Sequence, residues 1–323
     1  MEMWTKVRPL STVLIAVMVV TLAQARSITN AGLPAISNWY IHVNMDLIRN
    51  SEVGRKLALE TLIEALDDIE DELHIDIGDE IEAITLLGGE LPSSGRHVSD
   101  GAVILHGAIS TETRGALLSV LQKSGASVTI SAENGLDVYR VVNFEANLSN
   151  KGENGQHPGL TQGDPEALYY LFGDTQSLIT QNRIPMQTFL DANGYLGGLE
   201  GIGTDALLVL QADRALMQGG ANTTAEVATD WDFPILKNLN AVAIVIAADY
   251  DGLQISAQLQ ADSAEAALLV KDIVEGMVAL KSLSDSNGGM GDILRNVQFE
   301  NEGAVLHVEV PIAVDQVGAL KDL

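Results

Sequence analysis

Apolar and polar positions alternate in short stretches along the first half of the chain and predict β-strands there. Over residues 39–46, Trp39, Ile41 and Val43 fall on one side and polar residues on the other, which is the two-residue period of a half-buried strand. From Ser51 to residue 73 apolar residues recur every three or four positions, the period of an amphipathic helix. A second helix is predicted from Thr111 to Gly125. Further strands are predicted over residues 84–88, 102–109, 127–131 and 136–143.

The same two periods recur in the second half of the chain. Residues 263–283 predict a long amphipathic helix, and residues 184–192 predict a short one. Asn134-Gly135 and Asp251-Gly252 are typical of tight hairpin turns, and Asn301-Glu302-Gly303 joins a third pair of strands. Strands are predicted over residues 167–172, 206–211, 241–249, 253–260, 293–300 and 304–311.

The order of these elements predicts an α+β fold. Strand, helix, strand, strand, helix, strand is the split βαβ order of a ferredoxin-like domain. We therefore expect two ferredoxin-like sandwiches, each with an antiparallel or mixed sheet and with helices on one face. Both halves combine a strand hairpin with a helix, which suggests an internal duplication. Residues 150–165 are rich in Gly and Pro and nearly free of apolar side chains, so they predict a linker between domain 1 (residues 26–149) and domain 2 (residues 166–323).

The first 25 residues have the three parts of a secretory signal peptide. Lys6 and Arg8 supply the positive charge, residues 12–22 form an apolar segment, and Ala23-Gln24-Ala25 matches a signal peptidase site. Cleavage after Ala25 would place the protein in the periplasm or outside the cell, with no stable membrane insertion afterwards. The alternative is an uncleaved anchor, for which the apolar segment is short.

Composition excludes several classes of function. The chain has 323 residues, 44 Asp plus Glu against 18 Lys plus Arg, a formal charge of −26 and no Cys. Without Cys it can form neither disulfides nor thiolate metal sites. A surface this acidic repels phosphate backbones and anionic lipids, so we expect no nucleic-acid partner. With 46% hydrophobic residues the chain can still build packed cores.

Sequence motifs of catalysis are absent. The chain has no G-x-S-x-G, H-E-x-x-H or Walker sequence, so we predict no catalytic and no cofactor-binding residue. The sequence favours a non-catalytic binding protein of the bacterial envelope, with a protein or small-ligand partner held by an open sheet face or by the loop around Trp231. One alternative is a secreted hydrolase whose site is assembled from dispersed acidic and His residues. Another is a calcium-stabilised surface protein.

Two histidines and an aspartate are candidates for a metal site. His42 and Asp46 fall on the same side of the predicted strand 39–46. In a ferredoxin-like sheet the third strand lies beside the first, which would bring His106 close to His42. These three side chains would then form a metal site or an acid–base pair. The alternative is that they are ordinary polar residues on an open sheet face.

The segment from Glu60 to Glu82 holds eleven acidic residues and no Lys or Arg. Acidic residues near the C-terminal end of a helix oppose its dipole, at a cost of roughly 0.3–1 kcal/mol each. A hard cation such as calcium, bound by carboxylates, would offset that cost. The alternative is a solvated acidic surface screened by salt. The candidate calcium ligands are Asp67, Asp71, Asp76 and Asp79.

The calcium hypothesis predicts that calcium stabilises the protein. A cation that binds only the native state raises the melting temperature by mass action. Calcium added to the chain from Arg26 onward, at constant ionic strength, should raise Tm by several degrees. The double variant Asp67→Asn, Asp71→Asn should abolish that shift. An unchanged Tm with calcium and with chelator would identify the segment as solvated surface.

Overall fold

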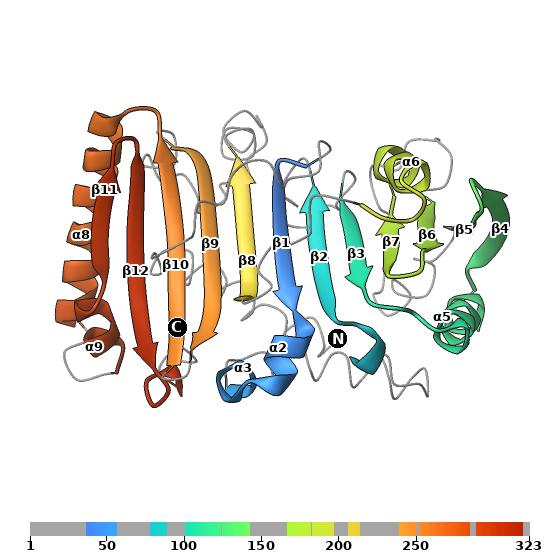
Figure 1. Cartoon of the computed structure of the whole chain (residues 1–323), viewed down its shortest axis with the longest axis horizontal. Helices are drawn as coiled ribbons and strands as arrows, with labels where there is room; N and C mark the ends of the chain where they lie inside the picture. The colour runs from blue at the N-terminus through green and yellow to red at the C-terminus, as the bar shows by residue number, and fades with distance from the viewer. Residues whose placement is uncertain are drawn as a thin grey trace, which may run out of the picture. The chain divides into compact units, whose positions relative to one another are not determined.

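A computed structural model of the chain shows the helices and strands of its described residues (Figure 1). By their contacts these residues form two compact units, which are described separately below. The predicted signal peptide, the predicted linker and the Trp231 loop lie outside the described residues. The described residues are 37–56, 78–88, 101–123, 125–142, 167–181, 183–196, 206–213, 239–249, 252–284 and 289–318.

The first unit is built on strands in the order β2-β3-β7-β6-β5-β4. The pairs β3–β7, β7–β6, β6–β5 and β5–β4 are antiparallel. Only the end of β2, from Leu87 on, is grouped with the other unit. The elements of this unit are η2 (Gly78–Glu80), β2 (Ala83–Gly88), β3 (Ala102–His106), α5 (Thr111–Lys123), β4 (Ser127–Glu133), β5 (Leu136–Val142), β6 (Leu168–Phe172), β7 (Gln176–Thr180) and α6 (Arg183–Asp191).

The second unit has the strand order β11-β12-β10-β9-β8-β1, and these strands pair antiparallel. Its core includes one face of the central strand β10, where Ile255 and Ala257 are fully buried. The elements of this unit are β1 (Trp39–Asn44), α2 (Met45–Asn50), α3 (Glu52–Lys56), β8 (Ala206–Asp213), β9 (Leu239–Asp249), β10 (Gly252–Ala261), α8 (Ala264–Ser284), α9 (Gly289–Arg295), β11 (Gln298–Glu302) and β12 (Val305–Ala313).

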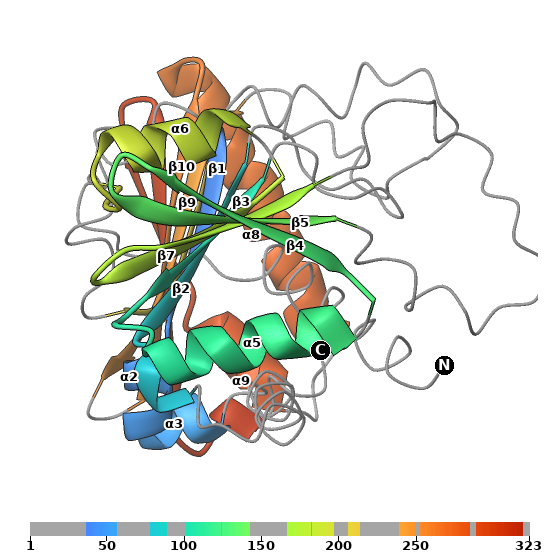
Figure 2. The same cartoon turned by 90° about the vertical axis from the view of Figure 1, so that its right-hand side faces the viewer.

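The structure confirms a mixed α/β chain with mostly antiparallel strands and few helices. It does not confirm the ferredoxin-like sandwiches. In the first unit α5 and α6 lie on opposite faces of the strands β4–β7 (Figure 2), whereas we expected all helices on one face. In the second unit β1 pairs with β8, and the strands from β8 to β10 follow as neighbours. The suggested duplication stays a prediction.

The two compact units do not divide the chain at residues 150–165. The strands β6 and β7 come after those residues but pair with β5 and β3, which come before them. Similarly, β1 belongs early in the chain but pairs with β8. Backbone hydrogen bonds between distant strands therefore decide the grouping, and the composition of the connecting segment does not.

Helix caps explain where the first predicted elements end. The predicted strand 39–46 stops at Asn44, because its side-chain Oδ1 accepts a hydrogen bond from the backbone N–H of Leu47 (2.9 Å) and caps α2. Ser51 caps α3 in the same way, through the N–H of Gly54 (2.9 Å). The predicted helix from Ser51 is confirmed as far as Lys56, and the rest of it lies outside the described residues.

Turn residues were good predictors of the hairpins. Asn134 and Gly135 have φ angles of 51° and 83°, which are the left-handed values that a tight β4–β5 turn requires. Several elements differ from the prediction, among them the helix α2, which was not predicted. The strand expected over residues 293–300 begins only at Gln298, because residues 289–295 form α9. The strand β7 was not predicted.

An acid from a distant part of the chain completes the cap of α5. Ser110 accepts a hydrogen bond from the backbone N–H of Thr113 (3.1 Å), and its own N–H donates to the Glu80 carboxylate (2.8 Å). This is the arrangement of a capping box, with an acid that comes from η2 rather than from the helix itself. Burial acts to raise the pKa of Glu80, but hydrogen bonds from Ser110 and Thr113 and the charge of Arg114 outweigh it, so the pKa is lowered.

Two glycines fix the position of α6. A Cβ added to Gly173, in the β6–β7 turn, would lie 2.4 Å from the carbonyl oxygen of Gly194. A Cβ on Gly194, just after α6, would lie 3.1 Å from Leu136 and 3.2 Å from the Cα of Gly173. Gly194 has φ of 81° and its N–H donates to the Phe189 carbonyl (2.9 Å), which closes the helix. The two backbones therefore touch, and α6 is held against the β6–β7 turn.

We predict opposite effects of the same substitution at two glycines of this unit. Gly173→Ala should lower the free energy of unfolding by about 1–3 kcal/mol, because the new methyl group overlaps the Gly194 carbonyl. Gly115→Ala, in α5, should raise it by about 0.5–1 kcal/mol, because a Cβ there meets open space and Ala favours the helix. Urea titration of both variants measures the two shifts. Equal effects at the two sites would contradict the close contact.

Candidate functional site

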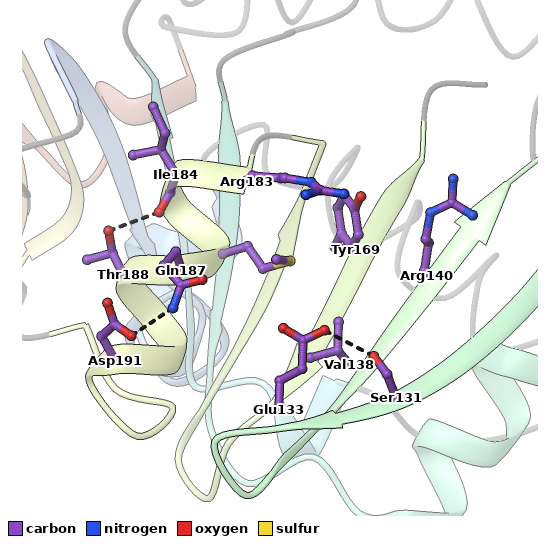
Figure 3. A pocket seen from close by; sticks show the side chains of 11 residues that line it. Ser131, Glu133, Val138, Arg140, Tyr169, Arg183, Ile184, Gln187, Thr188 and Asp191 are labelled. Carbon is purple, nitrogen blue, oxygen red and sulfur yellow. Dashed lines mark hydrogen bonds between the residues drawn. The ribbon is translucent and has the colours of Figure 1, made fainter. Parts of the chain in front are cut away.

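The first unit contains a cavity of about 550 Å³ between α6 and the strands β4, β5 and β6 (Figure 3). One wall belongs to the strands and the other to the helix. The lining residues are Ser131, Glu133, Val138, Arg140, Tyr169, Arg183, Ile184, Met186, Gln187, Thr188 and Asp191.

Strand register places the sheet side of the pocket. Ser131 of β4 lies opposite Val138 of β5, and Arg140 of β5 lies opposite Tyr169 of β6. Residues two apart on a strand point to the same face, so these cross-strand pairs form two adjacent rows on one face of the sheet. The other face carries Phe172, with the Arg114 guanidinium of α5 at 4.9 Å from its ring centroid. The pocket therefore opens on the face that α6 covers.

Helix α6 has two different sides. Met186, Phe189 and Leu190 are buried and hold the helix on the unit. Ile184, Gln187, Thr188 and Asp191 have the three- and four-residue spacing of a second stripe, and all four line the pocket. Pro185 stands in the first turn, where no helical partner is required for its missing N–H.

The acidic and basic side chains of the pocket are held differently. Glu133 accepts a hydrogen bond from the Ser131 hydroxyl (3.2 Å), and Asp191 accepts one from the Gln187 amide (2.7 Å). Arg140 and Arg183 line the same cavity, and within the described part of the chain neither guanidinium has a hydrogen bond or an ion pair. The pocket thus offers unused N–H donors and positive charge.

Charge is also separated along the pocket. Arg183 and Asp191 stand at opposite ends of α6, which at 1.5 Å per residue is a separation of about 12 Å. On the sheet side Arg140 lies opposite Tyr169. Glu133 is the last residue of β4 and lies beside the hairpin turn. In Figure 3 both arginines lie at the Tyr169 end, and both acids lie at the other. One end of the pocket is therefore basic and the other acidic.

The lining residues include one hydroxyl that is hydrogen-bonded to a carboxylate, that of Ser131 to Glu133 (3.2 Å). None of them is His, Cys or Lys. The Thr188 hydroxyl donates to the Ile184 carbonyl within α6 (2.9 Å) and is not aligned with a base. The arrangement is suited to holding a molecule by charge, hydrogen bonds and apolar contact.

The candidate metal ligands of the second unit have other partners or surroundings. His42 lies on β1 opposite Val209 and is only 6% exposed, and its burial lowers its pKa from the ordinary value of 6.5. Asp46 is not on the strand. It lies in the first turn of α2, where it forms an ion pair with Arg49 (2.6 Å).

The remaining candidates lie in the first unit or outside the described residues. His106 ends β3, and its Nε2 shares a hydrogen bond with the Thr85 hydroxyl of β2 (2.7 Å). Asp79 lies in η2, whereas Asp67, Asp71 and Asp76 are outside the described ranges. No group of three or more His, Asp or Glu among the residues described could hold a metal ion. Both metal hypotheses stay predictions.

Sequence reasoning missed Arg140 and Arg183. Arg140 is one of only 18 basic residues and lies on the same face of β5 as the buried Val138 and Val142, so a basic side chain among buried apolar ones was visible in the pattern. The sequence pattern did not show that Arg140 and α6 line the same cavity, because the position of α6 depends on the strand β7 that precedes it.

Helix α8 confirms the long helix predicted over residues 263–283 but is apolar on more than its buried side. Ala267 and Val270 are buried against the sheet, while Leu280 and Leu283 are 71% and 75% exposed. No described helix has the length and apolar character needed to cross a bilayer. The other exposed apolar residues of α8 are Leu268, Leu269, Ile273 and Met277.

No family model matches the chain, and no curated protein does. Solved structures of TP0453 are distantly similar. Crystal form I has a TM-score of 0.45 at 11% identity, over 92% of this chain and 98% of that one. Crystal form IV has a TM-score of 0.42 at 11% identity over 88% and 92% of the two chains, and crystal form III has 0.41 at 12% over 93% and 100%. Similarity at this level assigns neither a family nor a function.

The buried His42 predicts a loss of stability on mild acidification. Its folded pKa is below the unfolded value near 6.5, so the unfolded chain binds more protons as the pH falls. The contribution of this group is therefore complete above pH 6.5 and declines as the pH falls through that value. Unfolding free energies measured between pH 7.5 and 5.5 should decline less in His42→Gln than in the parent chain. Parallel curves would contradict the buried neutral imidazole.

Proposed function

We propose that this chain is a non-catalytic binding protein of the bacterial envelope and that it holds a small ligand in the pocket between α6 and β4–β6. The observation that carries the proposal is a 550 Å³ cavity that is lined by two arginines without protein partners among the described residues. Ligand pockets typically combine apolar walls with a few polar groups, and this volume lies in their usual range. The envelope location rests on the signal peptide predicted from the sequence.

Apolar side chains line the pocket beneath its charged ends. Val138, Met186 and Tyr169 are buried in the unit and line the cavity between the strands and α6. Ile184 at the edge of the pocket is 62% exposed. A ligand in the pocket would cover it and gain roughly 25 cal/mol for each Å² of apolar surface removed from water.

The two alternatives from the sequence have less support. A hydrolase would draw an acid, base or nucleophile from the pocket. Its lining has no His, and the Ser131 hydroxyl with the Glu133 carboxylate (3.2 Å) lacks, among the described residues, a third group that orients the base. The calcium-stabilised surface protein depends mainly on residues outside the described ranges, and the calcium melt tests it.

The proposal predicts binding of a neutral aromatic probe at this pocket. N-phenyl-1-naphthylamine fluoresces in apolar surroundings and should bind the full chain. Ser131→Trp should weaken its binding at least about tenfold, because an indole on the pocket face of β4 fills the cavity and strands accept aromatic residues. Fluorescence titration measures the affinity of the probe.

Two control variants locate the bound probe. Ala132→Trp places the same side chain on the opposite face of β4 and should leave binding unchanged. Leu280→Gln reduces the exposed apolar surface of α8 and should also leave it unchanged. Absence of binding, or loss of binding with Leu280→Gln in place of Ser131→Trp, would overturn the proposed function.

A further inference from the structure

We propose, on the basis of the proposed function, that the ligand is an amphiphilic anion, with one anionic oxygen group bound between Arg140 and Arg183 and an apolar body against Tyr169, Val138 and Met186. A carboxylate, sulfonate or phosphate group has the required chemistry. The basic end of the pocket receives the anionic group, and the apolar surface receives the rest of the molecule.

The first argument is the state of the two arginines. The chain carries a formal charge of −26, so acidic partners for a guanidinium are abundant. Nevertheless Arg140 and Arg183 make no ion pair with any described residue, and the pocket acids Glu133 and Asp191 already accept hydrogen bonds from Ser131 and Gln187. Each guanidinium presents a fork of N–H donors that matches an anionic oxygen group.

The second argument is the separation of charge. Both arginines lie at the Tyr169 end of the cavity, and Arg183 stands in the first turn of the nine-residue helix α6 (Figure 3). The N-terminal end of a helix adds partial positive charge at the same place. Glu133 and Asp191 at the far end oppose a second anionic group. The geometry therefore favours a molecule with a single anionic end.

A third argument comes from contrast with Arg114 in the same unit. Arg114 donates to the carbonyls of Ile109 (2.9 Å) and Gly173 (3.3 Å) and lies over the Phe172 ring. A structural arginine in this unit is therefore held by several protein groups. Arg140 is half-buried without such contacts, and a bound anion would supply what the described protein groups do not.

Two fluorescent probes with one skeleton test the inference. 8-Anilino-1-naphthalenesulfonate is N-phenyl-1-naphthylamine with an added sulfonate. Arg140→Gln and Arg183→Gln should each weaken binding of the sulfonate probe about tenfold, the usual order for a charge-assisted hydrogen bond, and should change binding of the neutral probe less than twofold. Added salt should weaken only the sulfonate probe.

Lys123→Gln is the matched control. Lys123 lies in the last turn of α5, makes no ion pair within the described residues and carries the same unit charge. Its loss should leave both probes unchanged, which separates local binding from the net charge of the chain. Circular dichroism of each variant confirms that it is folded.

Competition distinguishes the class of anionic group. Decanoate and decyl phosphate should displace the sulfonate probe from the parent chain, and decanol at the same concentrations should not. The anion that acts at the lower concentration identifies the preferred group. Displacement by decanol as effective as by the two anions would overturn the inference.

Failure of the inference and of the proposed function give different results. If the neutral probe binds and Ser131→Trp removes it, but the sulfonate probe is insensitive to both Arg variants, the anion inference is wrong and the binding function stands. If neither probe binds the parent chain, the proposed function is wrong and the inference falls with it.

Discussion

The pocket of the first unit depends on one contact between two glycine backbones. At Gly173 and Gly194 the β6–β7 turn and the end of α6 approach so closely that a Cβ on Gly173 would lie 2.4 Å from a carbonyl oxygen. The Gln176 amide oxygen accepts the N–H of Leu196 (2.8 Å) and ties down the segment after the helix. Because α6 is fixed at this end, it packs against β7, and the cavity lies between α6 and the strands β4, β5 and β6. A larger residue at either glycine would move the wall that carries Arg183.

The same turn also holds the helix on the other face of the sheet. Arg114 of α5 donates to the Gly173 carbonyl, and its guanidinium packs on Phe172, which in turn meets Tyr139 edge to face at 5.4 Å between ring centroids. Two helices on opposite faces therefore depend on one three-residue loop between β6 and β7. Arg114 thus uses its donors on carbonyl groups of its own unit. Arg140 and Arg183, which line the pocket on the other face, have no hydrogen bond to a described residue.

Local features of the fold could be predicted from the sequence because local physics decides them. Asn134-Gly135 predicts its hairpin, since only such residues adopt left-handed φ angles cheaply, and the apolar spacing of residues 263–283 predicts α8. The strand order could not be predicted, because periodicity indicates which segments are strands but not which strands pair with each other. The strand β7 is buried on both faces at Ser177 and Leu178 and so lacks the alternation that marks a strand.

The candidate site was beyond prediction for the same reason. It requires the register of Arg140 against Tyr169 and the placement of α6 over that face, and both follow from long-range pairing. Sequence reasoning instead chose His and Asp residues by their chemical type. The structure shows interactions of two of those residues, the ion pair of Asp46 with Arg49 and the hydrogen bond of His106 with Thr85. Residue type alone cannot separate a charge that has a partner from one that lacks it.

Acid should affect the two units in different ranges of pH, because their perturbed groups differ in kind. In the first unit the pKa of Glu80 is lowered by its cap hydrogen bonds and by Arg114, despite some burial, so its contribution is present above its ordinary pKa of 4.5 and is lost below it. In the second unit the buried His42 lowers the free energy of unfolding as the pH falls through 6.5. Between these two pH values Glu80 stays ionised, so the cap at the start of α5 keeps its charged hydrogen-bond acceptor. Protonation of Glu80 should therefore weaken the cap of α5 only at a more acidic pH than the one at which His42 begins to reduce the stability of the second unit.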